Sequence, residues 1–198
     1  MKVWLIIAVL LLGGCGDTAL EPLSSEDVIV AFGDSLTAGK GVSQDKAYPA
    51  VLAELTGFRV VNAGISGETT AEGLLRLADV INAENPSLLI LFEGGNDILR
   101  NHDLSKTKQN LDEMIGIAKE RGVQIAMVGV PRKQLFSSTA EFYTQLADEH
   151  KLPIQDDIVA SLLRKPAMKS DGVHFNVKGY RALAESIAQM LREAGAIE

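Results

Sequence analysis

The chain has 198 residues, of which 46% are hydrophobic, and this size and composition fit one domain with a sizeable core. Its formal net charge of −7 disfavours nucleic acid as a partner, because phosphate binding needs a basic surface. The single Cys excludes a disulfide framework and a thiolate metal cluster, and His102 and His150 lack the spacing of a His-based metal site. We therefore expect no cofactor and no metal.

The first segment of the chain is predicted to be an export signal. A positive start at Lys2 precedes an unbroken apolar run of ten residues, from Val3 to Leu12. This run is too short to span a bilayer, which needs about 20 residues, but it suits the apolar part of a signal peptide. The run ends in Leu12-Gly13-Gly14-Cys15, which resembles the processing motif of bacterial lipoproteins, in which the Cys is lipidated. An ordinary secretory signal with an incidental Cys is the alternative.

The chain is thus divided into a signal peptide over residues 1–14, a small polar tether over residues 15–26 and a folded domain over residues 27–198. We expect an exported lipoprotein that is anchored to the membrane through Cys15 and faces the periplasm or the cell exterior. A soluble periplasmic protein is the alternative, and a monomer is expected in either case.

The rest of the chain alternates between apolar runs of strand length and amphipathic helical patterns. Strands are predicted at Val28–Phe32, Phe58–Asn62, Leu88–Phe92, Val123–Val130 and, as a short edge strand, Leu152–Gln155. Helices are predicted at Tyr48–Thr56, Thr69–Asn82, Ser105–Arg121, Thr139–His150 and Val177–Ala194. Near-continuous Val, Ile and Leu runs are typical of strands that are buried on both faces of a parallel sheet. The alternation therefore predicts a single three-layer α/β/α sandwich with a flavodoxin-like parallel sheet.

Four short motifs lie where this fold would place catalytic loops. Three of them follow predicted strands, and the fourth precedes the last helix: Gly33–Gly39, Asn62–Gly64, Gly94–Asp97 and Asp171–His174. A strand order of 2-1-3-4-5 places the first strand between the second and the third, so that the first three motifs converge at one edge of the sheet. Ligands bind at this edge in open α/β sheets. Taken singly, each motif is also compatible with a plain turn or a helix cap, but their combination favours catalysis.

These motifs resemble those of the SGNH hydrolases, the GDSL family of esterases and lipases, and most closely its bacterial multifunctional thioesterase, lysophospholipase and arylesterase members. The resemblance covers residues 28–194 and implies the SGNH hydrolase fold, with the same three layers that the alternation predicts. It implies hydrolysis of a small carboxylic ester or thioester, or of a lysophospholipid, through an acyl-enzyme and without a cofactor or metal. No Gly-x-Ser-x-Gly elbow is present, which disfavours the α/β-hydrolase fold proper.

The resemblance implies a role for each motif residue. Ser35 would be the nucleophile, His174 its general base and Asp171 the group that orients the imidazole. The oxyanion hole would combine the backbone N–H groups of Ser35 and Gly64 with the side-chain amide of Asn96. Asp34 is interpreted as structural, shaping the loop by accepting backbone hydrogen bonds.

Two departures from the family pattern bear on the substrate rather than on the chemistry. Phe175 replaces a frequent Pro after the catalytic His, and Lys40 replaces a frequent aromatic residue after Gly39. Leu135 and Phe136, in the loop after the fourth strand, are expected either to contact an acyl chain or to anchor that loop. An O-deacetylase that acts on acetylated polysaccharide and a non-catalytic membrane-tethered binding module are the alternative functions.

Overall fold

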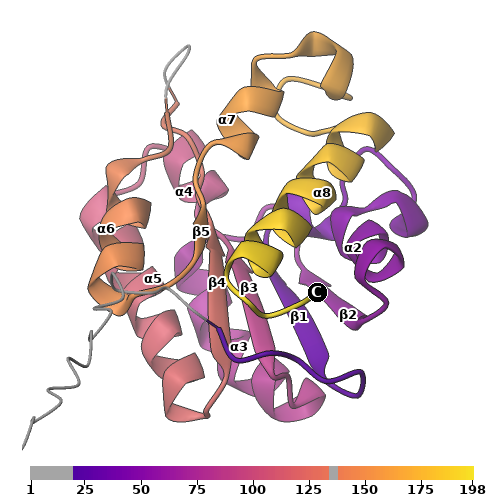
Figure 1. Cartoon of the computed structure of the whole chain (residues 1–198). Helices are drawn as coiled ribbons and strands as arrows, with labels where there is room; N and C mark the ends of the chain where they lie inside the picture. Colours follow the sequence, from indigo (N-terminus) through magenta and orange to yellow (C-terminus); the bar gives the residue numbers. More distant parts are fainter. Residues whose placement is uncertain (1–19, 134–137) are drawn as a thin grey trace, which may run out of the picture.

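The computed structural model describes residues 20–133 and 138–198, which form a five-stranded sheet with helices on both faces (Figure 1). The strand order is β2-β1-β3-β4-β5 and every neighbouring pair is parallel, as predicted. The strands are β1 Val28–Gly33, β2 Arg59–Gly64, β3 Leu88–Phe92, β4 Gln124–Val128 and β5 Ile154–Gln155. The predicted signal peptide and Cys15 lie outside the described residues.

Helices connect the strands and form the two outer layers. They are α1 Ser35–Ala38, α2 Tyr48–Thr56, α3 Thr70–Glu84, α4 Gly95–Leu99, α5 Leu104–Glu120, α6 Glu141–His150, α7 Ile158–Leu163 and α8 Val177–Glu193, with 3-10 turns η1 Gln44–Lys46 and η2 Pro166–Met168. Helix α2 packs against α8 on one face of the sheet, and α3 packs against α5 on the other (Figure 1). None of the helices in this described part is long and apolar enough to cross a membrane.

The two central strands explain why the sheet is stable between these layers. In β1 the side chains from Ile29 to Phe32 are fully buried, and β3 is buried along its whole length. Apolar strands of this kind remove both of their faces from water only when helices cover both sides of the sheet. Helix α8 is capped by Asn176, whose side chain accepts hydrogen bonds from the N–H groups of Lys178 and Gly179.

The five predicted helices are all present, with ends that differ by a few residues, but three short helices were not predicted. These are α1, α4 and α7, which have four to six residues and are too short to show a helical period in the sequence. Strand β4 is shorter than predicted and ends at Val128 rather than Val130. Beyond it, Pro131 pairs with Thr139 in an antiparallel bridge, so the chain leaves the parallel ladder.

The predicted tether is wrong for residues 20–23, because this segment lies against the folded domain. The N–H groups of Leu20 and Leu23 donate to the carbonyls of Ala194 and Ala196, each at 2.8 Å. The backbone of Glu21 exchanges two further hydrogen bonds with the side chain of Gln124. Leu20 and Leu23 also pack on the core, and this burial holds the segment in place.

Candidate active site

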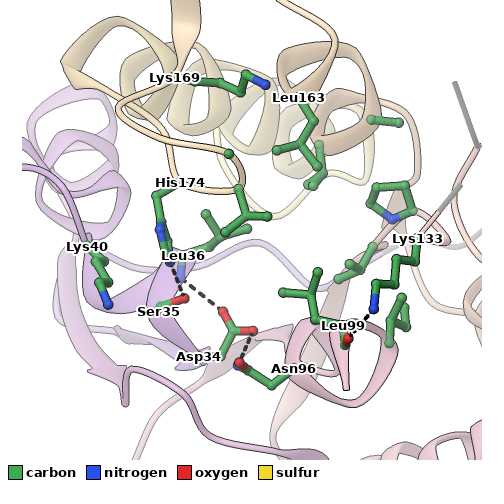
Figure 2. A pocket seen from close by; sticks show the side chains of 18 of the residues that line it. Asp34, Ser35, Leu36, Lys40, Asn96, Leu99, Lys133, Leu163, Lys169 and His174 are labelled. Carbon is green, nitrogen blue, oxygen red and sulfur yellow. Dashed lines mark hydrogen bonds between the residues drawn. The ribbon is translucent and has the colours of Figure 1, made fainter. Parts of the chain in front are cut away.

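An open cavity of about 690 Å³ lies at the carboxyl ends of the strands. Three of the four sequence motifs contribute to its wall, through Ser35, Asn96 and His174 (Figure 2). Their meeting follows from the strand order, because β1 lies next to β3 and the loops that follow both strands reach the same edge. The cavity is the place in the described structure where the predicted catalytic groups come together.

Ser35 is the first residue of α1, directly after β1. The Asp34 carboxylate caps this short helix by accepting from the Leu36 N–H at 2.9 Å, which agrees with the structural role predicted for it. Gly33 has to be a glycine, since a Cβ there would lie 2.0 Å from the carbonyl oxygen of Phe92 in the neighbouring strand. This close packing fixes the turn that presents the Ser35 hydroxyl, and Ser35 is 8% exposed.

The Ser35 hydroxyl meets an imidazole that arrives from the other end of the chain. Ser35 Oγ lies 3.0 Å from His174 Nε2, and His174 Nδ1 lies 2.7 Å from Asp171 Oδ2. The second carboxylate oxygen of Asp171 accepts from the N–H groups of Val173 and His174, both at 2.9 Å. These two N–H groups and the imidazole hold the pKa of Asp171 well below its usual range.

The ionised Asp171 determines which nitrogen of His174 carries the proton. A carboxylate can only accept, so Nδ1 donates to Asp171 and Nε2 keeps its lone pair toward Ser35. The loop is itself closed by a hydrogen bond from the Ser170 N–H to the His174 carbonyl at 3.0 Å. In this arrangement the imidazole of His174, oriented by the carboxylate of Asp171, can abstract the proton of the Ser35 hydroxyl when that hydroxyl attacks an electrophile.

Asn96 lines the cavity, but both hydrogens of its amide are already engaged. Its Nδ2 donates to Asp34 Oδ2 at 3.1 Å and to the Glu68 carbonyl at 2.9 Å. An amide nitrogen carries only two hydrogens, so donation to an oxyanion requires sharing or exchanging one of these bonds. The bond to Asp34 is the one on the side of Ser35 (Figure 2).

Gly64 does not fit the donor role predicted for it and requires a correction. Its N–H donates to Asn62 Oδ1 at 3.0 Å, and Gly64 is not among the residues that line the cavity. A Cβ at this position would lie 2.2 Å from the backbone nitrogen of Ala38, so the glycine permits β2 to pack against α1. The lack of a side chain at Gly64 allows the backbones of β2 and α1 to pack closely, and it does not make room for a substrate.

Gly67 has the position that was predicted for Gly64, and the sequence reasoning missed it. It lines the cavity beside Ser66 and has a φ of +87°, which favours glycine. Within residues 20–133 and 138–198, no acceptor is found for the N–H of Gly67 or for that of Ser35. The sequence offered Gly67 as a second candidate, because it is the other glycine of Gly64-Ile65-Ser66-Gly67 and lies three residues after the predicted donor Gly64.

Four buried acidic side chains support the loops beneath the cavity. Asp97 accepts from the N–H and the hydroxyl of Thr70, which joins the third motif to the start of α3. Glu68 is paired with Arg76, whose guanidinium lies 4.0 Å from the centre of the Phe32 ring. The other two are Asp34 and Glu93, which are 4% and 1% exposed.

Asp34 and Glu93 have raised pKa values. Burial raises the pKa of Asp34 to about 6, against the opposing effect of the Leu36 N–H. Burial, followed by the charge of Asp34, raises the pKa of Glu93 well above its usual range. The Glu93 Oε2 atom is buried and has no hydrogen-bond partner in the described part of the chain, which is consistent with a neutral carboxylic acid.

The remaining predictions for the site have mixed outcomes. Lys40 lies on the cavity wall, whereas Phe175 is fully buried, packs edge-on against Tyr180 and does not line the cavity. Leu135 and Phe136 lie outside the described residues. No group of three or more His, Cys, Asp or Glu side chains in the described ranges is arranged to hold a metal ion.

The chain is similar in sequence to known proteins over most of its length. The sequence profile of the GDSL-like Lipase/Acylhydrolase family matches residues 31–182. An arylesterase from Vibrio mimicus is 30% identical over 179 residues, which cover 85% of this chain and 89% of that protein. Thioesterase 1/protease 1/lysophospholipase L1 from Escherichia coli (strain K12) is 29% identical over 177 residues, which cover 85% of each chain.

A solved structure shows the same similarity in three dimensions. The crystal structure of TesA has a TM-score of 0.77 and 26% sequence identity to this chain, and the match covers 84% of this chain and 99% of TesA. The segment matched by the family profile contains the strand-end loops that carry Ser35 and Asn96, together with Asp171 and His174. The chain therefore belongs to the GDSL-like lipase and acylhydrolase family.

Proposed function

We propose that this protein is a serine esterase that hydrolyses carboxylic esters or thioesters through an acyl-enzyme on Ser35. The observation that carries the proposal is the unbroken chain of hydrogen bonds from Asp171 through His174 to the Ser35 hydroxyl, at the wall of an open cavity. The names of two relatives, an arylesterase and a thioesterase/lysophospholipase, support this substrate class.

In the first half of the reaction Ser35 Oγ attacks the acyl carbonyl carbon and its proton passes to His174 Nε2. The carbonyl oxygen becomes an oxyanion, and Asp171 stabilises the imidazolium that forms. When the tetrahedral intermediate collapses, the bond to the alcohol or thiol breaks, and the leaving group takes the proton from His174. The acyl group remains on Ser35 as an ester.

In the second half water takes the place of the leaving group. His174 removes a proton from the water, whose oxygen attacks the acyl carbonyl. Collapse of the second intermediate breaks the bond to Ser35 Oγ, which recovers its proton from His174. The acid leaves and the enzyme returns to its starting state.

Backbone donors support the oxyanion in this proposal. The N–H groups of Ser35 and Gly67 have no acceptor in the described part of the chain, and both residues line the cavity. Asn96 would supply the third donor by giving up its hydrogen bond to Asp34. Uncharged donors that are held in place before the reaction stabilise the developing charge without the reorganisation that water requires.

The test is hydrolysis of p-nitrophenyl esters of graded chain length by the wild-type domain and its variants. Ser35→Ala or His174→Ala should lower kcat by roughly 10³- to 10⁶-fold. Ser66→Ala is the matched control, because it removes another hydroxyl from the same cavity outside the hydrogen-bonded chain, and it should retain activity. A fluorophosphonate should label Ser35, and near-normal turnover by Ser35→Ala would exclude the proposal.

We also propose, from the sequence of residues 1–15 alone, that the chain is exported and anchored through Cys15.

Only four residues separate Cys15 from the docked Leu20, a stretch that spans at most roughly 18 Å. Leu20 binds beyond the C-terminal end of α8. This end lies about 25 Å from the N-terminal end of the same helix, which follows His174 in the chain. An anchor at Cys15 would thus leave the cavity facing away from the membrane. Mass spectrometry of membrane-extracted protein tests the acylation, and an unmodified Cys15 would refute it.

A further inference from the structure

The two edges of the sheet differ in how they are protected. Strand β5, at one edge, has only two residues and follows Pro153, which has no N–H to offer to another strand. Strand β2, at the other edge, has six residues without a proline, and within the described part of the chain it pairs only with β1 (Figure 1). Its one charged residue, Arg59, begins the strand and pairs with Glu84 of α3. Sheet edges are usually protected by short strands, prolines or charges, and β2 lacks such protection from Val60 onward.

The backbone of β2 has hydrogen-bonding groups that face away from the sheet. Neighbouring residues of a strand direct their N–H and C=O groups to opposite sides. The N–H of Ile65, just beyond β2, donates to the Gly33 carbonyl of β1 at 2.9 Å, so Ile65 and every second residue before it face β1. Val60 and Asn62 therefore direct their backbone groups toward the open edge. Gly64 does the same, since its N–H donates to the side chain of Asn62 rather than to β1.

A groove of about 450 Å³ runs along this edge, between β2 and α3. Ala63 is in register with Phe32 of β1, and Arg76 of α3 lies over the Phe32 ring, so the Ala63 side chain points to the face of the sheet on which α3 lies. Val61, two residues earlier, points to the same face. Val61 and Ala63 are only partly buried, whereas Val30 and Phe32 beside them in β1 are fully buried. Helix α3 thus covers β1 and leaves an apolar strip of β2 open to the groove.

Two side chains that line the groove have hydrogen-bond donors without an acceptor in the described residues. Arg76 uses Nε and Nη2 to bind Glu68 and the Ala63 carbonyl, which leaves Nη1. The Asn62 side chain uses only Oδ1, which accepts from a backbone N–H, and this leaves Nδ2. Because its other nitrogens hold the guanidinium in place, Arg76 Nη1 is already positioned to donate to a carboxylate.

The small side chains of the open strip favour a partner other than a second copy of this chain. Two copies that paired through β2 would bring a second strip with the same Val61 and Ala63 beside the first, so that neither strip would be covered. A segment with large apolar side chains at alternate positions would instead cover the strip while its backbone pairs with Val60 and Asn62.

We propose that the groove between β2 and α3 binds an extended segment of a partner protein. The segment adds a strand beside β2, places large apolar side chains on Val61 and Ala63, and directs a carboxylate to Arg76. The residues that line this groove are distinct from those that line the catalytic cavity, so the proposal does not depend on the esterase function.

The probe is the synthetic peptide acetyl-Glu-Phe-Thr-Phe-Thr-Phe-Glu-amide. Its alternation puts the aromatic rings on one face of a strand, and a carboxylate at each end allows either direction of binding. Titration into the isotope-labelled protein should give saturable shifts of the backbone amide resonances of β2. A peptide of the same composition, acetyl-Glu-Phe-Phe-Thr-Thr-Phe-Glu-amide, should bind at least roughly tenfold more weakly, because its rings do not share one face. Replacing both Glu residues of the probe by Gln should weaken binding roughly three- to tenfold.

A matched pair of variants of α3 tests the groove itself. Ala83 is exposed and lines the groove, so the ring of Ala83→Trp should fill it and abolish binding of the probe. Ala71→Trp is the control, because this exposed residue of the same helix lies outside the groove and should leave binding unchanged. Both variants should hydrolyse p-nitrophenyl esters as the wild type does, since neither residue lines the catalytic cavity.

Three outcomes would overturn the proposal. The first is the absence of saturable shifts in β2 when the probe is added. The second is binding of the probe that is equal to that of the rearranged peptide, or that is unchanged in Ala83→Trp. The third is a shift of the β2 amides that grows with protein concentration without any peptide, which would assign the edge to a second copy. Loss of ester hydrolysis in the wild type would bear on the esterase function alone.

Discussion

The side-chain amide of Asn96 donates to the carboxylate of Asp34 at 3.1 Å, and both residues line the cavity. Asp34 also caps the helix that begins at Ser35, through the Leu36 N–H. One buried carboxylate therefore contacts both the turn of the nucleophile and the predicted oxyanion donor. The two sites are 62 residues apart in the chain, and the neighbouring strands β1 and β3 bring them together.

We expect Asp34→Asn to reduce kcat by about 10²-fold, because a small misplacement of a catalytic group has an effect of this size. An Asn at this position can still accept from the Leu36 N–H and cap α1, so the fold should persist. Its own amide group, however, would oppose the Asn96 amide, and two donors cannot bind each other. The measurement is kcat and KM on an aryl ester, together with the melting temperature.

A double-mutant cycle with Asn96→Ala distinguishes positioning from a general structural role. Asn96→Ala alone should lower kcat by about 10²- to 10³-fold, as expected for the loss of an oxyanion donor. If Asp34 acts through Asn96, adding Asp34→Asn to Asn96→Ala should cost little more. Fully additive losses would show that Asp34 does not act by holding Asn96.

Asp171→Asn should lower kcat while leaving KM nearly unchanged. The Asn oxygen can keep the hydrogen bonds from Val173 and His174, but its amide would face His174 Nδ1 as a donor and favour the wrong tautomer. In a buried triad this change costs about 10⁴-fold, and we expect a smaller loss here because the Asp171 side chain is 51% exposed to water. Steady-state kinetics on an aryl ester measures it, and unchanged kcat would remove Asp171 from the proposed mechanism.

Long elements with a strong apolar pattern could be predicted from the sequence, because buried strands and helix faces consist of apolar residues. Leu88–Phe92 is apolar throughout and lies at the centre of the sheet, where both of its faces are covered. The docking of residues 20–23 could not be predicted from the backbone hydrogen bonds that Leu20 and Leu23 donate to Ala194 and Ala196. Backbone groups are the same in every residue, so such pairing leaves no pattern in the sequence.

The chemistry of the site was easier to predict than the geometry of its donors. Ser35, Asp171 and His174 are recognisable because their side chains supply the reactive groups. An oxyanion donor from the backbone has no side chain to mark it, and both Gly64 and Gly67 suit a close approach. Only the fold distinguishes them, since Gly64 faces α1 and Gly67 faces the cavity.

Gly64→Ala tests the packing role of this glycine. The new Cβ would lie 2.2 Å from the Ala38 nitrogen and 2.7 Å from the Thr37 carbonyl carbon, so α1 must move. We expect a loss of about 1–3 kcal/mol in the free energy of unfolding, accompanied by loss of activity as Ser35 is displaced. Gly116→Ala in α5 is the control, because its Cβ would meet nothing within 4 Å and should stabilise the chain slightly. Wild-type stability of Gly64→Ala would contradict the packing role.

Glu93→Gln should increase stability relative to the wild type as the pH rises. The folded-state pKa of Glu93 is raised above its ordinary value of 4.5, mainly by burial. Below pH 4.5 the carboxyl is protonated in both the folded and the unfolded chain, and the neutral acid makes its full contribution to stability. As the pH rises, the unfolded chain ionises first, so this contribution is lost until the folded-state pKa is passed. Gln has no proton to lose, and its oxygen can keep the hydrogen bond from the Gly94 N–H.

The difference in melting temperature between Glu93→Gln and the wild type should therefore grow as the pH is raised above 4.5, the ordinary pKa of a glutamate. Asp34, whose pKa is raised to about 6, contributes a pH dependence of the same sign to both proteins. Glu120→Gln is the matched control, since this glutamate is exposed at the end of α5 and the same change is made outside the buried carboxyl groups. A difference for Glu93→Gln that stays constant across this range would mean that the buried carboxyl titrates as it does in the unfolded chain. In that case the unpartnered Oε2 atom could not be explained by a retained proton.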